Sequence, residues 1–247
     1  MLEPSLPLLA VVAGIAFLAA FVQGVTGFGS ALVAMPLLAP VVGVREAAAL
    51  VALLSLAVNF ALLLPARREL PWRRVAPLLA GSLAGIPAGV LLLAGTDPRL
   101  ARGLLGISLV ATSLAMLRAR HPTIGPGKGP ALALGAIAGL LGGAFNINGP
   151  VVTLYAAARG WGREETHPAL QLYFLASGLL IVALHGVAGV TSRQVLLASA
   201  VSMPALGLGS IAGWAVHRRV SEERYRRLLL LTLLASGAAF LAAAGRG

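Results

Sequence analysis

The segment FVQGVTGFGSALVAMPLL, residues 21–38, decides the fold because it places glycine and small polar residues inside an apolar run. Gly24, Thr26, Gly27 and Ser30 lie near its middle. A helix that only crosses a bilayer has no need of them, and glycine allows the backbone to leave helical geometry. We therefore expect the chain to interrupt a helix at this point inside the membrane.

The whole chain is apolar enough to be a polytopic membrane protein. Of its 247 residues, 58% are hydrophobic and 11% are charged, and the mean hydropathy is +0.91. Apolar stretches of about 18 residues or more recur along its length, as bilayer-spanning helices require. The loops are short, so we expect a single transmembrane domain over residues 1–247. Cysteine is absent, which excludes disulfides and thiolate metal sites.

A second stretch repeats the plan of the first. In GAIAGLLGGAFNINGPVVTLYAA, residues 135–157, small residues again separate two apolar runs. An alignment of the two stretches pairs Gly24 with Gly143, Gly27 with Asn146 and Gly29 with Asn148. An ordered series of matches of this kind indicates duplication. We predict two duplicated halves, repeat 1 over about 1–118 and repeat 2 over about 129–247.

The fold class that follows is an all-α polytopic membrane protein with about five segments in each half. We expect eight full spans plus broken or re-entrant helices, up to ten segments in all. The predicted segments lie at about 6–23, 30–43, 47–64, 75–95 and 100–117 in the first half, and at about 131–142, 149–158, 166–189, 195–216 and 225–243 in the second.

The distribution of positive charge favours inverted halves. If each broken segment crosses once, the 19 Lys and Arg residues divide almost evenly between the two sides. If it folds back or crosses twice, each half has an odd number of segments and most basic residues fall on one side. Positive charge in short loops marks the cytoplasmic face, so the uneven division is preferred. The second half is then inverted, and both termini lie outside the cytoplasm. The larger set comprises Arg67, Arg68, Arg73, Arg74, Arg118, Arg120, Lys128, Arg159, Arg163, Arg218, Arg219, Arg224, Arg226 and Arg227.

The two interruptions form the candidate substrate site. Inverted repeats with discontinuous helices bind their substrates near the bilayer midplane in many secondary transporters. A helix that restarts after a break offers unpaired N–H groups and the positive end of its dipole, which together can hold an anion. Asn146 and Asn148, like glycine, enter left-handed conformations readily. For each glycine, close helix packing is the alternative explanation. The candidate substrate-binding residues are Gln23, Gly24, Thr26, Gly27, Phe28, Gly29, Ser30, Asn59, Asn146, Ile147, Asn148, Gly149, Gln171 and Tyr173.

Charged residues are scarce inside the predicted spans. No Asp, Glu or Lys lies at a span centre, so the carboxylate relay of many cation-coupled pumps is not evident. The candidates for proton coupling are His185, which can titrate near neutral pH, and Arg102, near a helix end. We expect neither a metal nor a cofactor. The formal charge of +11 lies mostly in loops that meet anionic headgroups. The expected partners are therefore membrane lipids and a small anion rather than nucleic acid, and assembly into a homo-oligomer is left open.

Both motifs resemble those of the TauE/SafE (TSUP) family of sulfite and organosulfonate exporters. The resemblance rests on GVTGFGSALVAMPLL, residues 24–38, and GLLGGAFNINGPVV, residues 139–152. Length, duplication and a basic central loop extend it over essentially the whole chain. The second motif departs from the glycine-rich form that the resemblance leads us to expect. Membership would imply secondary active export of sulfite, sulfoacetate or other organosulfonates, with protons as a coupling ion.

The residues alone leave other functions open. A passive small-anion channel would use the same site. An intramembrane lipid-pyrophosphate phosphatase would need a nucleophile and an acid–base cluster, whereas the acidic residues here lie at loop edges, so we expect no enzyme. A structural scaffold would gain nothing from two costly interruptions. The arginine-dominated basic residues and alanine-rich helices suggest a bacterial source, and hence a multi-pass protein of the bacterial inner membrane.

Reporter fusions test the predicted inversion. A fluorescent protein that matures only in the cytoplasm is expected to stay dark at the C-terminus, because an odd number of segments per half places that end outside. The same reporter inserted in the basic loop at 118–130 is expected to fluoresce. Fluorescence of whole cells is the measurement, and a bright C-terminal fusion would contradict the inverted arrangement.

Overall fold

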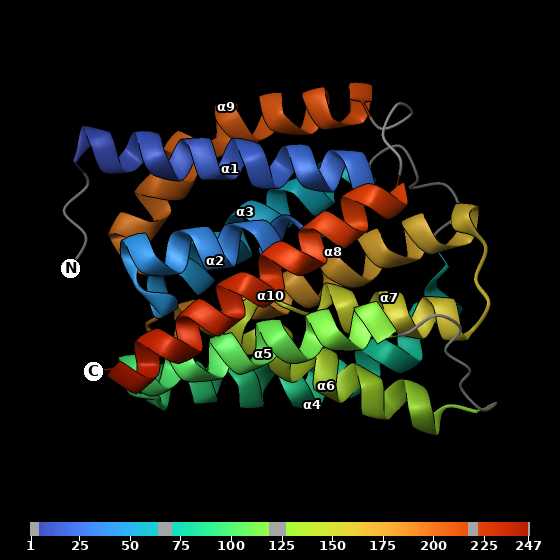
Figure 1. Cartoon of the computed structure of the whole chain (residues 1–247). Helices are drawn as coiled ribbons and strands as arrows, with labels where there is room; N and C mark the ends of the chain where they lie inside the picture. The colour runs from blue at the N-terminus through green and yellow to red at the C-terminus, as the bar shows by residue number, and fades with distance from the viewer. Residues whose placement is uncertain (1–4, 64–70, 119–126, 217–221, 247) are drawn as a thin grey trace.

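The computed structural model describes residues 5–63, 71–118, 127–216 and 222–246 (Figure 1). Five of the basic residues used to assign the sides, Arg67, Arg68, Arg120, Arg218 and Arg219, lie outside the described residues. The described residues form ten helices: α1 (Leu6–Thr26), α2 (Ser30–Val42), α3 (Val44–Leu63), α4 (Trp72–Gly95), α5 (Pro98–Arg118), α6 (Gly129–Phe145), α7 (Gly149–Ala158), α8 (Arg163–Val187), α9 (Arg193–Val216) and α10 (Glu222–Arg246).

The predicted all-helical architecture is confirmed for the described residues, and each predicted segment corresponds to one helix in the same order. Six helices, α1, α3, α4, α5, α8 and α9, are long and apolar enough to cross a membrane. α2, with 13 residues, and α7, with 10, are too short to cross a hydrocarbon core of about 30 Å. The chain is therefore a multi-pass membrane protein in which the second helix of each half, α2 or α7, is short.

The structure contains both expected interruptions. Gly27, with φ +81°, and Gly29, with φ +100°, separate α1 from α2. Asn146, with φ +59°, ends α6 in the left-handed conformation that its alignment with Gly27 predicts. The same prediction is wrong for Asn148, whose φ is −85°. One left-handed residue is enough here, because the Ile147 N–H already bonds the Leu141 carbonyl at 3.2 Å and Asn148 begins the next turn.

The prolines near the breaks play different roles. Pro150 lies in the first turn of α7, where its missing N–H removes no helical hydrogen bond. Pro36 lies inside α2 and does not end it, although proline removes one helical hydrogen bond there. The first interruption is therefore made by its glycines.

Equivalent helices of the two halves make equivalent contacts. The first helix of each half packs on the fourth helix of the other half, as α1 on α9 and α6 on α4. The third helices, α3 and α8, contact each other, and so do the fifth helices, α5 and α10. Figure 1 shows the α1–α9 pair and the α4–α6 pair at opposite edges, with α3 and α8 between them.

Close contacts fix the direction of these pairs. Gly209 and Gly213 of α9 lie against the carbonyl oxygens of Phe17 and Phe21 of α1, so these two helices run parallel. α4 and α6 also run parallel, because Gly81, Gly85 and Gly89 of α4 lie in the same order against Leu132, Ala136 and Leu140 of α6. In contrast, α5 and α10 run antiparallel, because Gly106 lies against Leu241 while the earlier residue Gly103 lies against the later residue Ala244.

The crossing of α4 and α6 depends on glycines spaced four residues apart. Gly81, Gly85 and Gly89 of α4 face Gly135, Gly139 and Gly143 of α6 across the contact. A Cβ at any of the three α4 positions would lie less than 3.0 Å from a backbone oxygen of α6. Small residues at this spacing let two helix backbones approach closely in a membrane.

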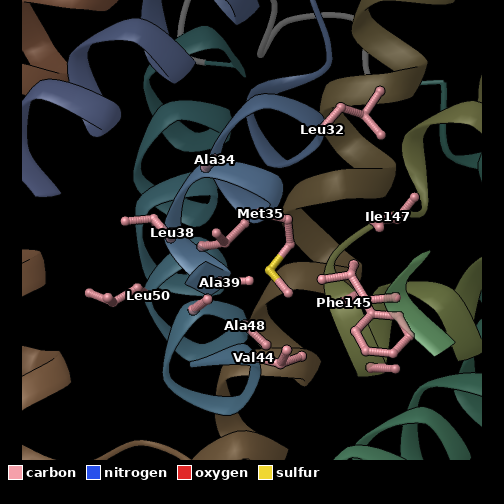
Figure 2. Packing of buried hydrophobic residues seen from close by; sticks show 14 of the residues in the cluster. Leu32, Ala34, Met35, Leu38, Ala39, Val44, Ala48, Leu50, Phe145 and Ile147 are labelled. Carbon is pink, nitrogen blue, oxygen red and sulfur yellow. The ribbon is translucent and has the colours of Figure 1, made fainter. Parts of the chain in front are cut away.

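A large apolar cluster packs the second break against the first half (Figure 2). Met35 and Leu38 of α2 lie in it with Ala48 of α3, and all three are buried. Phe145 and Ile147 of the second break belong to the same cluster. Ile147, which the sequence suggested as a site residue, is fully buried here and acts as a packing residue.

Substitution at the α4–α6 crossing is expected to destabilise the protein. A Cβ in Gly85→Ala would lie less than 3.0 Å from the Ala136 carbonyl oxygen, and overpacking of this kind costs about 1–3 kcal/mol. Gly14→Ala is the matched control, since a Cβ there meets no atom within 4 Å. The measurement is the thermal unfolding midpoint in detergent. Equal midpoints for the two variants would show that α4 and α6 can move apart at this crossing without loss of stability.

Candidate functional site

A cavity lies between the two breaks and is bounded by the central parts of α3 and α8. Its volume is about 40 Å³, larger than the roughly 10–15 Å³ that one ordered water needs. Seven residues that the sequence suggested line this cavity: Gln23, Gly29, Ser30, Asn59, Asn146, Asn148 and Gly149. The structure therefore brings together residues from α1, α3 and both interruptions at one place.

The start of α2 supplies backbone donors to the cavity. The first hydrogen bond of this helix runs from the Val33 N–H to the Gly29 carbonyl at 3.2 Å. The N–H groups of Ser30, Ala31 and Leu32 therefore have no acceptor in the helix, and all three residues line the cavity. α7 also starts at the cavity, with Gly149, but the proline that follows removes one donor.

Amide and hydroxyl side chains supply the other polar groups. Gln23 Nε2 donates to Asn59 Oδ1 at 2.6 Å, and the hydroxyls of Ser30 and Ser55 lie 3.2 Å apart. Asn59 is 5% exposed, and no acceptor for its Nδ2 group lies among the residues that the structure describes. Asn148 Nδ2 lies 3.4 Å from the hydroxyl of a serine on α8. The cavity thus offers neutral donors that a ligand with acceptor oxygens can engage.

Each break is hydrogen-bonded to the third helix of the other half. Gln171 Nε2 of α8 donates to the Gly27 carbonyl at 2.6 Å, and Asn146 Nδ2 donates to the Ala48 carbonyl of α3 at 2.8 Å. The His167 ring lies directly against Gly27, where a Cβ would meet Cδ2 at 2.7 Å. In the first contact the side chain comes from the helix, and in the second it comes from the break. The two breaks are therefore held by reciprocal hydrogen bonds.

The remaining suggested residues have structural contacts instead of a place on the cavity wall. Gly24 packs against the backbone of α9, which is the packing role left open for it. The Thr26 hydroxyl bonds the carbonyl of Phe28 at 2.6 Å, inside the break itself. The Tyr173 hydroxyl lies 2.7 Å from the hydroxyl of Ser82 on α4. Together with Gly27, Phe28, Gln171 and Ile147, these residues support the site and do not line it.

The two candidates for proton coupling also lie away from the cavity wall. His185 is fully buried, and its Nε2 lies 2.8 Å from the Gly143 carbonyl near the end of α6. Arg102 is exposed, and its Nε donates to the Pro98 carbonyl at 3.3 Å. Within the described parts of the chain, no three His, Asp or Glu residues come together as metal ligands.

Sequence reasoning missed the walls that α3 and α8 contribute. Ala52, Ser55, Leu56 and Asn59 follow the spacing of one face of a helix, so Asn59 alone could have indicated the other three. On α8 the lining residues Phe174, Gly178 and Ile181 show the same spacing. Gln171 lies one turn earlier on that face but bonds the Gly27 carbonyl, and Tyr173 lies on another face. The missed lining residues are Ala31, Leu32, Ala52, Ser55, Leu56, Phe174, Gly178 and Ile181.

The second break needs both the conformation and the amide of Asn146, and two substitutions separate them. Asn146→Gly keeps the left-handed φ and loses the hydrogen bond to Ala48, which is worth about 1 kcal/mol. Asn146→Ala loses the same hydrogen bond and keeps a Cβ in that conformation, where alanine is roughly 1–2 kcal/mol less favourable than glycine. We expect thermal unfolding midpoints to fall from wild type to Asn146→Gly to Asn146→Ala. Equal midpoints for the two variants would show that the conformation imposes no cost.

Comparison with known proteins agrees with the two motifs and the helical architecture. The chain matches the family model for the sulfite exporter TauE/SafE over residues 12–240. It is 28% identical over 231 residues to the "Probable sulfite/organosulfonate exporter TauE" of Cupriavidus necator, an alignment that covers 90% of this chain and 89% of that protein. No solved structure matches the chain. Since the family model spans both breaks and most of the chain, the resemblance is confirmed, and the chain belongs to the TauE/SafE family of sulfite exporters.

Proposed function

We propose that this membrane protein is a secondary active transporter that exports small sulfur-containing anions such as sulfite, sulfoacetate or other organosulfonates. The family and the printed name of the Cupriavidus necator relative support the substrate class. The observation that carries the site is the cavity between the two breaks, into which α2 and α7 begin. Transporters with discontinuous helices bind substrate at such places.

The chemistry of the cavity suits a sulfonate. This group carries three acceptor oxygens and one delocalised charge. The free N–H groups at the start of α2 and the Asn59 Nδ2 group are donors for its oxygens. Leu56, Phe174 and Ile181 form an apolar side of the same cavity, where the organic part of a sulfonate would lie. Donors on one side and apolar contacts on the other favour a small amphiphilic anion.

We also propose that the two halves are inverted repeats. The antiparallel packing of α5 against α10 supports this, because the two helices are equivalent in the halves. In the other equivalent pair, Ala52 of α3 clusters with Ile181 of α8, while Leu56 lies beside Gly178, so these helices also run antiparallel. The start of α1 and the end of α10 lie on the same side of the molecule in Figure 1, as two termini outside the cytoplasm require.

Coupling to protons and a bacterial inner-membrane location complete the proposal. His185 contacts the carbonyl of Gly143 just before the second break and does not line the cavity, so the only route from it to the site is through the end of α6. Arg102 lies at the surface of the bundle and would act only at a helix end. Lipids surround the apolar outer faces, and a homo-oligomer would have to form through them.

Substitution of Asn59 is the sharpest test of the binding site. Asn59→Ala removes a donor to a charged ligand, so we expect methanesulfonate to bind at least about tenfold more weakly. Ser202→Ala is the matched control, because this buried hydroxyl on α9 bonds the Ala198 carbonyl and lies outside the cavity. Calorimetry on the detergent-purified protein gives the affinities, and gel filtration checks that both variants are folded.

Flux in proteoliposomes then separates a transporter from a channel. A secondary transporter accumulates labelled sulfite against its gradient when an ion gradient is imposed, whereas a channel only equilibrates it. If methanesulfonate binds the wild type and Asn59→Ala with equal affinity, the cavity is not the binding site. Equilibration without accumulation would replace the exporter by a passive anion channel.

A further inference from the structure

We infer that the cavity selects singly charged anions, so that sulfite is carried as bisulfite and not as its dianion. The inference rests on the anion site proposed above and concerns the charge of the ligand in it. Three sets of observations support it: the helix starts at the cavity, the lining side chains, and two amides whose orientations are set by hydrogen bonds.

The backbone offers roughly one positive charge to the cavity. The N-terminus of a helix carries about half a unit of positive charge. α2 begins at Ser30 and α7 at Gly149, and both residues line the cavity. Together the two helix starts balance one negative charge and leave the second charge of a dianion without a counter-charge.

The polar side chains around the ligand position are neutral. Within the described part of the chain, the lining polar residues are amides and hydroxyls: Gln23, Ser30, Ser55, Asn59, Asn146 and Asn148. Neutral donors stabilise an anion through dipoles, which is enough for one delocalised charge. A second charge buried without a partner is strongly disfavoured in a site of low dielectric.

Two amides point to a ligand with both acceptor and donor atoms. The Asn59 Nδ2 group, on a residue that is 5% exposed, meets no acceptor among the described residues and is ready to donate to a ligand oxygen. Asn146 uses its Nδ2 group for the bond to the Ala48 carbonyl, so its Oδ1 atom is the end left for a ligand. An oxygen in that position repels a dianion and accepts a hydrogen bond from the proton of bisulfite.

Selection of bisulfite links sulfur export to proton export without a titrating side chain. Bisulfite is sulfite plus one proton, so each bisulfite that leaves removes one sulfite and one proton from the cytoplasm. The elements around the cavity carry several described ionisable side chains, and none of these lines the cavity. They are Arg45 and Glu46 of α3, Tyr155 of α7 with Arg159 just after it, and Glu165, His167, Tyr173 and His185 of α8. The pH dependence of binding is therefore assigned to the ligand.

Binding of three anions to the wild-type protein at two pH values tests the inference. Methanesulfonate is singly charged and sulfate doubly charged at both about pH 6 and about pH 9, whereas sulfite changes from bisulfite to the dianion between them. We expect calorimetry to show an unchanged affinity for methanesulfonate, and sulfite affinity falling about tenfold for each pH unit above the pKa of bisulfite. Sulfate should bind at least about 100-fold more weakly than methanesulfonate at both pH values.

Each other outcome has a defined meaning. Sulfite affinity that does not change with pH, or sulfate binding as tight as methanesulfonate, would overturn the selection and leave the anion site in place. A parallel loss of methanesulfonate and sulfite at high pH would also overturn it, because a titrating group of the protein would then be responsible. If none of the three anions binds measurably, the result would contradict the anion site itself, and with it the proposed function.

Discussion

Unwound backbone inside a membrane must have its polar groups satisfied by the protein, and the first break of this chain meets that demand from the other half, to which the second break is also bonded through its side chain. Gln171 of α8 bonds the carbonyl of Gly27, and Asn146 bonds the carbonyl of Ala48 on α3. An unsatisfied group at this depth would cost several kcal/mol. Both breaks are therefore held by contacts between the two halves of the chain.

Close helix crossings place the breaks where these bonds can form. Gly143 packs against the Ile86 carbonyl of α4 shortly before α6 ends, and Gly24 packs against α9 shortly before α1 ends. Both crossings are parallel and join a first helix to the fourth helix of the other half. The glycines near each break thus have a packing role, while the glycines and the asparagine within the break set its backbone conformation. Sequence alone does not separate these two roles, because both use the same residue type.

The positions of the helices and of both interruptions could be predicted, since apolar length and glycine placement are local properties of the chain. The left-handed conformation of Asn146 also followed from its alignment with Gly27. The cavity wall on α3 follows the face of Asn59 and could have been extended from it, whereas the wall on α8 could not be predicted, because it depends on which helix faces meet across the molecule. Gln171 is an example. A polar residue in an apolar span indicates a functional or structural role, but only the fold shows that Gln171 bonds the Gly27 carbonyl while Phe174 lines the cavity.

The contacts also restrict the motions by which the proposed secondary active transport would expose the cavity to each side in turn. A motion that separated the two halves as rigid bodies would open the α1–α9 and α4–α6 crossings, where backbones meet through glycine. It would also break the two hydrogen bonds that hold the interruptions. Movement of α3 and α8 against each other costs less, because the Leu56 side chain, and no backbone atom, is what a Cβ at Gly178 would meet there, at 3.4 Å. These two helices form the cavity walls, so a small shift between them changes access to the ligand while the close crossings stay intact.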